Sequence, residues 1–302
     1  MAKDTTISKK DKDAALENQE SFSYWGKVFR RLRRHKLAMV SLFILIAIIL
    51  IVVFVPMFMH IDPDKVDLSQ ALQPPSIHHL MGTDDNGRDE FARLLYGGRI
   101  SLLVGFAVTF FSGLLGILMG IWAGYKRGFW DSFLMRVDEM MMTIPELPLL
   151  IVAAKMRFIP NSVVKLIVIM SAFGWVGIAR LIRGETLSIR EEEYVEATKA
   201  IGMADRTVVW KHLLPNTMAV SIVWSTLRIG RVIIAEATLS FFGLGVQPPT
   251  PSWGNMLLGA QTYIWTSQWL VWWPGLSILL VTLLFNFLGD GLRDAMDPKM
   301  FM

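Results

Sequence analysis

Uninterrupted apolar runs of about twenty residues constrain this 302-residue chain more than any other feature. A helix of roughly 20 apolar residues is long enough to span the hydrocarbon core of a bilayer. Hydrophobic residues make up 53% of the sequence, more than the roughly 45–50% that is typical of soluble domains. The sequence therefore predicts an all-α, polytopic membrane protein.

Six transmembrane helices are predicted from these runs. They lie near residues 37–59, 100–124, 130–154, 162–181, 216–244 and 269–291. The third run is interrupted by charged residues and prolines, namely Asp138, Glu139, Pro145, Glu146 and Pro148. The first run is longer than the apolar core of a signal peptide, which has roughly 7–15 residues, so a retained span is expected.

Basic residues gather on one side of the predicted membrane. They flank the start of the first span, the end of the second and the end of the fourth (Arg30, Arg31, Arg33, Arg34 and Lys36; Lys126 and Arg127; Arg180, Arg183 and Arg190). Loops rich in lysine and arginine stay in the cytoplasm. Both termini are therefore expected to be cytoplasmic, in a protein of the cytoplasmic (inner) membrane.

The spans divide the chain into successive segments. These are a cytoplasmic N-terminal tail with a basic amphipathic helix at 1–36, the first transmembrane helix at 37–59, an extracytoplasmic loop with a short interfacial helix at 60–99, a five-helix core at 100–291 and a cytoplasmic C-terminal tail at 292–302. The core contains a cytoplasmic loop at 190–215. The basic amphipathic helix is suited to lie against anionic lipid headgroups.

Glycines repeat at four-residue spacing in the second span, at Gly116, Gly120 and Gly124, with Gly113 nearby. Glycines on one face of a membrane helix let another helix approach closely. The pattern predicts helix packing without saying which helix, or which chain, is the neighbour.

Missing residues exclude several kinds of chemistry. The chain has no cysteine, so it has neither disulfides nor thiolate sites, and it lacks the G-x-x-x-x-G-K-[ST] loop that would bind ATP. The adjacent His78 and His79 are expected to be a solvated pair rather than metal ligands. The net charge of +4 is modest and lies beside apolar runs, which does not suggest nucleic-acid binding. We therefore expect no catalytic residue, metal or cofactor in this chain.

The cytoplasmic loop between the fourth and fifth spans predicts a helical hairpin. Acids crowd the start of a helix at 192–201, where the helix dipole favours them, and Gly202 supplies a left-handed stop. Asp205 is expected to cap a second short helix, which Pro215 is expected to break before the fifth span. A protruding hairpin of this kind can dock a partner protein, and the alternative is an interfacial helix that rests on lipid.

This loop resembles the EAA loop of membrane subunits in ATP-binding-cassette importers. Five positions fit the pattern (Glu196, Ala197, Gly202, Leu214 and Pro215), whereas Thr198 and His212 depart from it. The resemblance implies that the loop is a coupling helix, which sits in a groove of an ATPase subunit and transmits its closure.

Three further stretches resemble the C-type membrane subunit of oligopeptide and dipeptide importers. They are the segment at 82–101, the segment at 239–254 and the C-terminal segment at 289–299. The resemblance implies the type I importer permease fold and several partners: a homologous B-type permease subunit, two cytoplasmic ATPase subunits that bind ATP and Mg, and an extracytoplasmic peptide-binding protein.

The first of these stretches contains Gly82, Thr83, Asp84, Gly87, Arg88 and Asp89. Gly87 is expected to provide a turn, and Asp89 is expected to cap a short interfacial helix that reaches Tyr96. This helix could contact the substrate-binding protein or seal the outer end of the bundle.

Charged residues at membrane depth are costly and tend to face cavities or one another. The fifth span carries Arg228, Arg231 and Glu236, and the two arginines share a face because they lie three residues apart. We expect the arginines to line the translocation path and to meet a substrate carboxylate or an acid such as Glu146. The alternative is that they pair with acids of a partner subunit for packing alone.

Peptide uptake is the function that the resemblance implies, although nickel-chelate and glycoside importers share this subunit type. An ion-coupled secondary transporter would instead use the intramembrane acids as a proton relay. It is disfavoured because the spans show no inverted repeat and the coupling loop would have no purpose. A membrane scaffold or sensor that recruits a protein through the hairpin is a third possibility.

Overall fold

The computed structural model describes residues 24–59, 62–156 and 162–296. The predicted N-terminal tail and the last residues of the C-terminal tail lie outside these ranges. Within them, regular structure is helical, apart from an isolated antiparallel bridge between Thr83 and Asp89. The α-helices are α2 (Tyr24–Leu32), α3 (Lys36–Met59), α4 (Glu90–Lys126), α5 (Phe129–Thr143), α6 (Glu146–Lys155), α7 (Val163–Gly174), α8 (Val176–Arg190), α9 (Glu193–Ala200), α10 (Asp205–Val208), α11 (Leu214–Phe241), α12 (Trp253–Ala260) and α13 (Trp269–Met296). Short 3₁₀ turns, η1 (Leu68–Gln70) and η3 (Gln261–Tyr263), and a π-helical turn, η2 (Val209–Leu213), complete the set.

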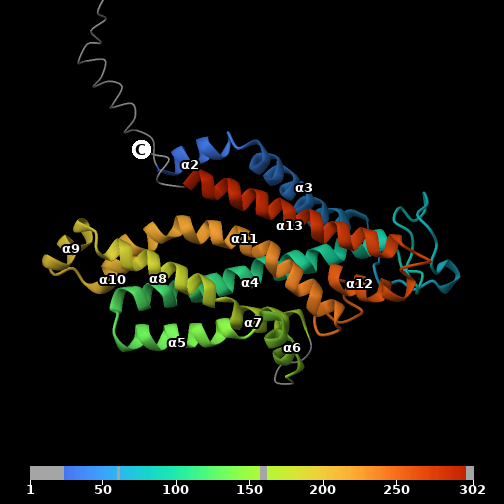
Figure 1. The fold of residues 1–302 in the computed structure, drawn as a ribbon. Helices are drawn as coiled ribbons and strands as arrows, with labels where there is room; N and C mark the ends of the chain where they lie inside the picture. The colour runs from blue at the N-terminus through green and yellow to red at the C-terminus, as the bar shows by residue number, and fades with distance from the viewer. Residues whose placement is uncertain (1–23, 60–61, 157–161, 297–302) are drawn as a thin grey trace, which may run out of the picture.

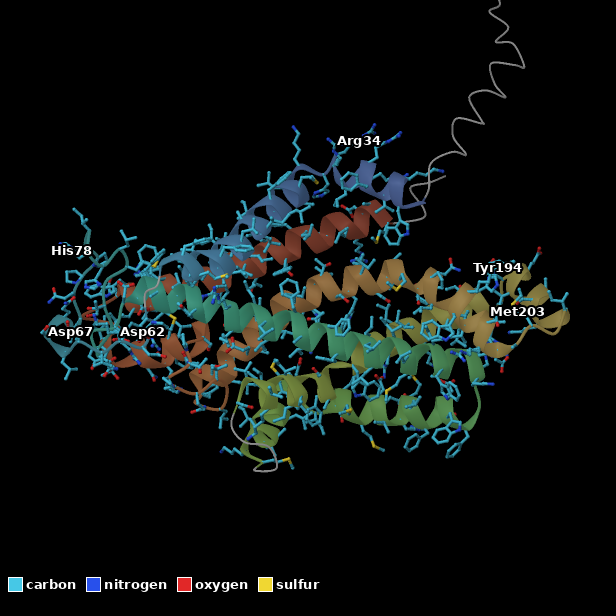
Figure 2. All side chains as sticks on the ribbon, turned by 180° about the vertical axis from the view of Figure 1, so that it is seen from behind. Arg34, Asp62, Asp67, His78, Tyr194 and Met203 are labelled. Carbon is cyan, nitrogen blue, oxygen red and sulfur yellow. The ribbon has the colours of Figure 1, made fainter. Side chains whose placement is uncertain are left out.

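The long helices form an elongated bundle (Figure 1). Helix α4 packs against α7, α8 and α11, and α13 packs between α11 and α3. Helices α9 and α10 lie at one end of the bundle, and the segment at 62–89 lies at the other. Figure 2 shows this division by its labelled residues, with Tyr194 and Met203 at one end and Asp62, Asp67 and His78 at the opposite end.

Within the described residues, five helices are long and apolar enough to cross a membrane: Lys36–Phe58, Glu90–Lys126, Val163–Arg190, Asp205–Phe241 and Trp269–Met296. The third predicted span, 130–154, is not one continuous helix, because α5 ends at Thr143 and α6 begins at Glu146. Pro145 has no N–H to donate and restricts the residue before it. Ile144 is accordingly extended, with φ −91° and ψ 125°.

The short interfacial helix predicted to end at Tyr96 is not a separate element. Helix α4 runs without a break from Glu90 to Lys126. Gly97 and Gly98 lie inside this helix, where both are buried and other segments pack closely against them. A Cβ on Gly97 would lie 3.2 Å from the Ser252 carbonyl carbon, and one on Gly98 would lie 2.9 Å from the Trp253 ring.

The sequence predicted that Pro215 would break the helix between the hairpin and the fifth span. The structure shows no break there. Helix α10 continues through η2 into α11, and Pro215 lies in the first turn of α11. In η2 the Leu214 N–H donates to the Val209 carbonyl, one residue further back than in an α-helix. The widened turn just before Pro215 accommodates the proline ring and the missing N–H. The hydrogen bonds of the helix therefore shift by one residue at this turn, and the helix does not end.

The glycines of the second span pack against α8 of the same chain. A Cβ on Gly120 would lie 2.5 Å from the Ala179 carbonyl oxygen, and one on Gly124 would lie 2.8 Å from Cβ of Thr186. Close approach of the two backbones is therefore possible only because side chains are absent at these positions. The glycine pattern therefore marks a close seam between α4 and α8.

Helix α2 is amphipathic, as predicted. Val28 and Leu32 are buried in a cluster with Ala295 and Met296 of α13. Arg34, just after the end of α2, points away from the bundle in Figure 2. One face of this basic segment is therefore used for packing on α13.

Candidate functional site

The hairpin of α9 and α10 is a turn of defined geometry at the end of the bundle. Gly202 has φ +77°, so the predicted left-handed stop is confirmed. Its N–H donates to the Lys199 carbonyl (2.9 Å), and the Met203 N–H donates to the Thr198 carbonyl (3.0 Å). No heavy atom lies within 4 Å of a Cβ built on Gly202, and Ile201 beside it is 78% exposed. The tip of the hairpin is open to a partner surface.

Apolar packing holds the hairpin to the bundle. Val195 of α9, Val208 of α10 and Leu213 of η2 are completely buried. They share a hydrophobic cluster with Ile178 and Ile182 of α8. Both arms of the hairpin are therefore anchored in one cluster with α8.

Polar contacts tie the same hairpin to the end of α4. The Asp205 carboxylate accepts from the Tyr125 hydroxyl (2.6 Å) and from Nζ of Lys126 (2.6 Å). Asp205 is therefore not the predicted helix cap; Ala204 holds that position without a side-chain hydrogen bond. Arg190 donates to the Tyr125 carbonyl (2.8 Å). Sequence reasoning missed Tyr125, although the basic turn after the second span and the acid at 205 could have suggested a contact.

Burial also changes the pKa of Lys199, a basic residue of α9. The Nζ of Lys199 lies 5.2 Å from the centre of the Tyr125 ring. Loss of hydration, reinforced by the nearby Arg190 charge, lowers the pKa of the Lys199 ammonium from its ordinary value. Lys199 thus adds to the contacts between α9 and the end of α4.

The residues predicted to contact an ATPase fall into two groups. Glu196, Ala197 and Pro215 are exposed, together with Gly202. Thr198 instead donates its hydroxyl to the Val195 carbonyl (2.7 Å), and the His212 ring lies 5.9 Å from the Tyr194 ring. The two positions that depart from the EAA pattern therefore participate in contacts within the hairpin segment.

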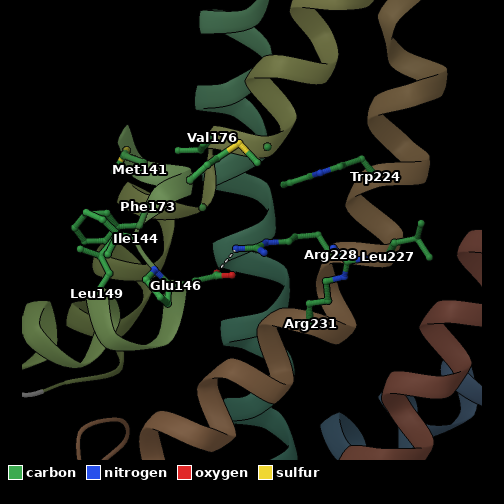
Figure 3. Close-up of a pocket in the computed structure, with 14 residues that line it drawn as sticks. Met141, Ile144, Glu146, Leu149, Phe173, Val176, Trp224, Leu227, Arg228 and Arg231 are labelled. Carbon is green, nitrogen blue, oxygen red and sulfur yellow. Dashed lines mark hydrogen bonds and ion pairs between the residues drawn. The ribbon is translucent and has the colours of Figure 1, made fainter. Parts of the chain in front are cut away.

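A cavity of about 380 Å³ lies between α6, α8 and the middle of α11, lined among others by Glu146, Arg228 and Arg231 (Figure 3). Nη2 of Arg228 is 2.7 Å from Oε1 of Glu146. Figure 3 shows the Arg228 side chain reaching across from α11 to Glu146 at the start of α6. The structure thus brings together three of the four residues predicted for the translocation path.

Glu236, the fourth of these residues, does not line this cavity. It is completely buried and accepts hydrogen bonds from the hydroxyls of Ser101 (2.9 Å) and Ser240 (2.7 Å). The same hydroxyls accept from backbone N–H groups, Ser101 from Trp253 (3.2 Å) and Ser240 from Val246 (3.0 Å). Glu236 is therefore the centre of a polar cluster that joins α4, α11 and the segment leading to α12.

Helix α5 is fastened to α8 by two ion pairs that the sequence did not reveal. Arg183 contacts both oxygens of Asp131 (2.5 and 2.7 Å). Arg180 contacts the completely buried Asp138, with Nε 2.7 Å from Oδ2. The two acids lie seven residues apart on α5, which places them on one face. Such a repeat of acids in an apolar segment could have indicated basic partners on another helix.

The motif at residues 82–89, predicted to be extracytoplasmic, folds into a compact turn ahead of α4. Thr83 is completely buried, and its hydroxyl donates to the Gln70 carbonyl (2.5 Å). The Asp84 carboxylate accepts from the Arg88 N–H (2.9 Å) and from Arg88 Nε (2.7 Å). Gly82 has φ +82°, a conformation that other residues rarely adopt.

The end of this motif starts α4, as predicted. Gly87 has φ +70° and forms the turn, and Oδ1 of Asp89 accepts from the Ala92 N–H (2.9 Å) as the N-cap. The other oxygen of Asp89 lies 2.8 Å from Nδ1 of His79, whose Nε2 lies 2.5 Å from Oε1 of Gln70. His79 thus joins Asp89 to Gln70 and does not form a solvated pair with His78, as the sequence had predicted it would. Among the described residues, no group of three or more histidine, aspartate or glutamate side chains could hold a metal ion.

Two family models match different parts of the chain. Residues 116–302 match the family model of the binding-protein-dependent transport system inner membrane component. Residues 23–75 match the model of the N-terminal TM domain of oligopeptide transport permease C.

Similar proteins cover almost the whole sequence. The chain is 41% identical over 281 residues to a dipeptide transport system permease protein of Alkalihalophilus pseudofirmus, covering 92% of this chain and 91% of the relative. It is 38% identical over 291 residues to an oligopeptide transport system permease protein of Bacillus subtilis (95% and 94%). A glutathione transport system permease protein of Escherichia coli O157:H7 is 37% identical over 276 residues (91% and 90%). With its all-helical bundle and its type I importer permease fold, the chain belongs to the family of binding-protein-dependent transport system inner membrane components, the membrane subunits of ATP-binding-cassette importers.

Proposed function

We propose that this chain is one of two homologous, non-identical membrane subunits of an ATP-driven peptide importer. It contributes half of the translocation path and makes or breaks no covalent bond. The B-type permease subunit forms the other half, a peptide-binding protein delivers substrate from outside, and two cytoplasmic ATPase subunits bind ATP and Mg. The names of the dipeptide and oligopeptide permeases that it resembles support peptide as the substrate.

The observation that carries this proposal is the anchored hairpin of α9 and α10. It presents Glu196, Ala197 and the Gly202 turn at its surface while both arms are fixed in the bundle. A hairpin anchored in this way can transmit the closure of the ATPase subunits to the transmembrane helices. The translocation path then opens to the other side of the membrane. The basic residues at the same end of the bundle support a cytoplasmic position for the hairpin and for both termini.

Removing the charge of Glu196 tests this proposal. Glu196→Gln should weaken co-purification of the ATPase subunits and reduce ATP-driven peptide uptake by tenfold or more, because the hairpin contact loses a polar partner. Glu139→Gln is the matched control, since Glu139 is an exposed acid on α5 whose ion pair with Arg136 is long, at 3.4 Å. Unchanged ATPase association and unchanged uptake in Glu196→Gln would contradict the coupling role.

A further inference from the structure

The α6–α11 cavity carries an unbalanced charge. Arg228, Arg231 and Glu146 are the ionisable residues among the described residues that line it, so its formal charge is +1. Arg228 lies roughly 20 Å along the helix axis from the end of α11 at Phe241, which is well inside the bilayer. A net positive charge at such depth is stabilised by an anion, and one carboxylate would neutralise it.

Arg228 is the fixed member of its ion pair. Its side chain is 14% exposed, against 51% for Glu146. Gly174 leaves room for the guanidinium, since a Cβ there would lie 3.3 Å from Nη2 of Arg228 and 3.1 Å from Cβ of Ser112. The buried Nε of Arg228 has no hydrogen-bond partner among the described residues. Arg228 therefore keeps donor capacity, and Glu146 is the partner that can exchange.

Arg231 is available beside it. It lies one helical turn from Arg228 on the same face, is exposed, and has no ion pair among the described residues. Two guanidinium groups in this arrangement can each present paired N–H donors to a carboxylate. The pair is suited to a ligand carboxylate rather than to a phosphate group with two negative charges, because one negative charge neutralises the formal charge of the cavity.

The remaining cavity wall is apolar and adaptable. Met141, Met142, Phe173, Trp224 and Leu227 contribute to it, and methionine side chains adjust to neighbours of different shape. Such a wall does not select one side chain. The charged pair, by contrast, recognises a group that every unmodified peptide carries, its C-terminal carboxylate.

Resting on the proposed function, we propose that Arg228 and Arg231 form a carboxylate site in the translocation path, where the C-terminus of the peptide displaces Glu146 from Arg228. Glu146 then acts as a built-in competitor. When the peptide arrives, one carboxylate replaces another on Arg228, and when it leaves, Glu146 returns. Arg228 is never left without a counter-charge, so capture and release both proceed without the cost of a buried unpaired ion.

Uptake by the complete importer in proteoliposomes tests this exchange, with two peptides that differ only in a C-terminal carboxylate or carboxamide. Arg231→Gln should lower the ratio of acid to amide uptake by tenfold or more relative to the unmodified chain. Arg136→Gln removes a charge from an exposed site on α5 and should leave the ratio unchanged. Because all variants use the same binding protein, selection by that protein cancels from the comparison. Equal loss of both peptides in Arg231→Gln would assign the arginine to a partner subunit's acid and overturn the proposal.

A second measurement keeps all three charged residues in place. The chain has no cysteine, so a single one can be introduced at Gly177, which lines the cavity, or at Gly184 on the same helix, which does not. Both positions have open space for a side chain. The acid peptide should slow maleimide labelling of Gly177→Cys at least fivefold more than the amide, with no difference at Gly184→Cys. Equal protection by the two peptides would overturn the carboxylate site, whereas absence of ATP-driven uptake of either peptide would instead refute the proposed function.

Discussion

Glu236 is a buried acid whose hydrogen bonds hold helices together. Its carboxylate accepts hydrogen bonds from Ser101 and Ser240, and through them reaches the backbone ahead of α12. Among the described residues, no basic side chain forms an ion pair with it. Its role is therefore to join helices at membrane depth rather than to meet substrate in the α6–α11 cavity.

Removing this carboxylate should destabilise the fold. Glu236→Ala leaves the Ser101 and Ser240 hydroxyls without their acceptor and should cost about 1–3 kcal/mol of stability. Thermal unfolding of the detergent-solubilised importer would measure the loss. Glu236→Gln, which keeps an acceptor oxygen, should retain most of the stability. An alanine variant as stable as the unmodified chain would show that the cluster does not support the bundle.

At the residue scale, sequence reasoning found some partners and missed others. It suggested that an arginine at 228 or 231 could meet Glu146, because charges in an apolar span need counter-charges. It could not separate Glu236 from this group, since helical spacing gives a face but not the residues that cover it. Ser101 was missed because a serine in an apolar run has no distinctive pattern.

The elements differ in how well their local sequence determined them. Pro145 ends a helix and Pro215 does not, although both lie in or beside predicted spans. The difference lies in the preceding turn, which is extended at Ile144 and π-helical at 209–213. Whether a proline breaks a helix depends on this turn, and the turn depends on packing with Val208 and Leu213 buried against the bundle.

The seam between α4 and α8 gives a sharp prediction at the scale of elements. Gly120→Ala places a Cβ 2.5 Å from the Ala179 carbonyl oxygen and should push the helices apart, at a cost of about 1–3 kcal/mol. Gly113→Ala on the same helix is the control, because its nearest neighbour would be 3.8 Å away. Thermal unfolding of both variants would test this. Equal stability of the two would contradict the close packing of α4 and α8.

The link from the hairpin to α4 gives another prediction. Asp205→Asn removes the ion pair with Lys126, which is largely exposed and should contribute little to stability. We expect the ATPase subunits still to bind while substrate-stimulated ATP hydrolysis falls severalfold, because the hairpin is held less firmly to α4. Asp294→Asn, an exposed acid on α13, is the control. Unchanged stimulation by substrate would show that this contact does not transmit motion.

At the scale of the whole molecule, the bundle has two chemically different ends. The anchored hairpin lies at one end, and the segment at 62–89, which includes the acidic turn of residues 82–89, lies at the other (Figure 2). Charge patterning of the sequence predicted this division, because loop composition is set by membrane topology. It could not predict how the hairpin is tied to α4 and α8, since those contacts join residues far apart in the chain.

In the proposed importer, the α9–α10 hairpin docks an ATPase subunit and the opposite end of the bundle does not. Two isoleucines mark these ends, Ile201 at the hairpin tip (78% exposed) and Ile77 in the opposite loop (94% exposed). Because the chain has no cysteine, each can be replaced by a single cysteine that carries a photo-crosslinker. In the assembled importer, Ile201→Cys should crosslink to an ATPase subunit and Ile77→Cys should not. Capture of the ATPase from Ile77→Cys, with none from Ile201→Cys, would contradict both the coupling role and the orientation.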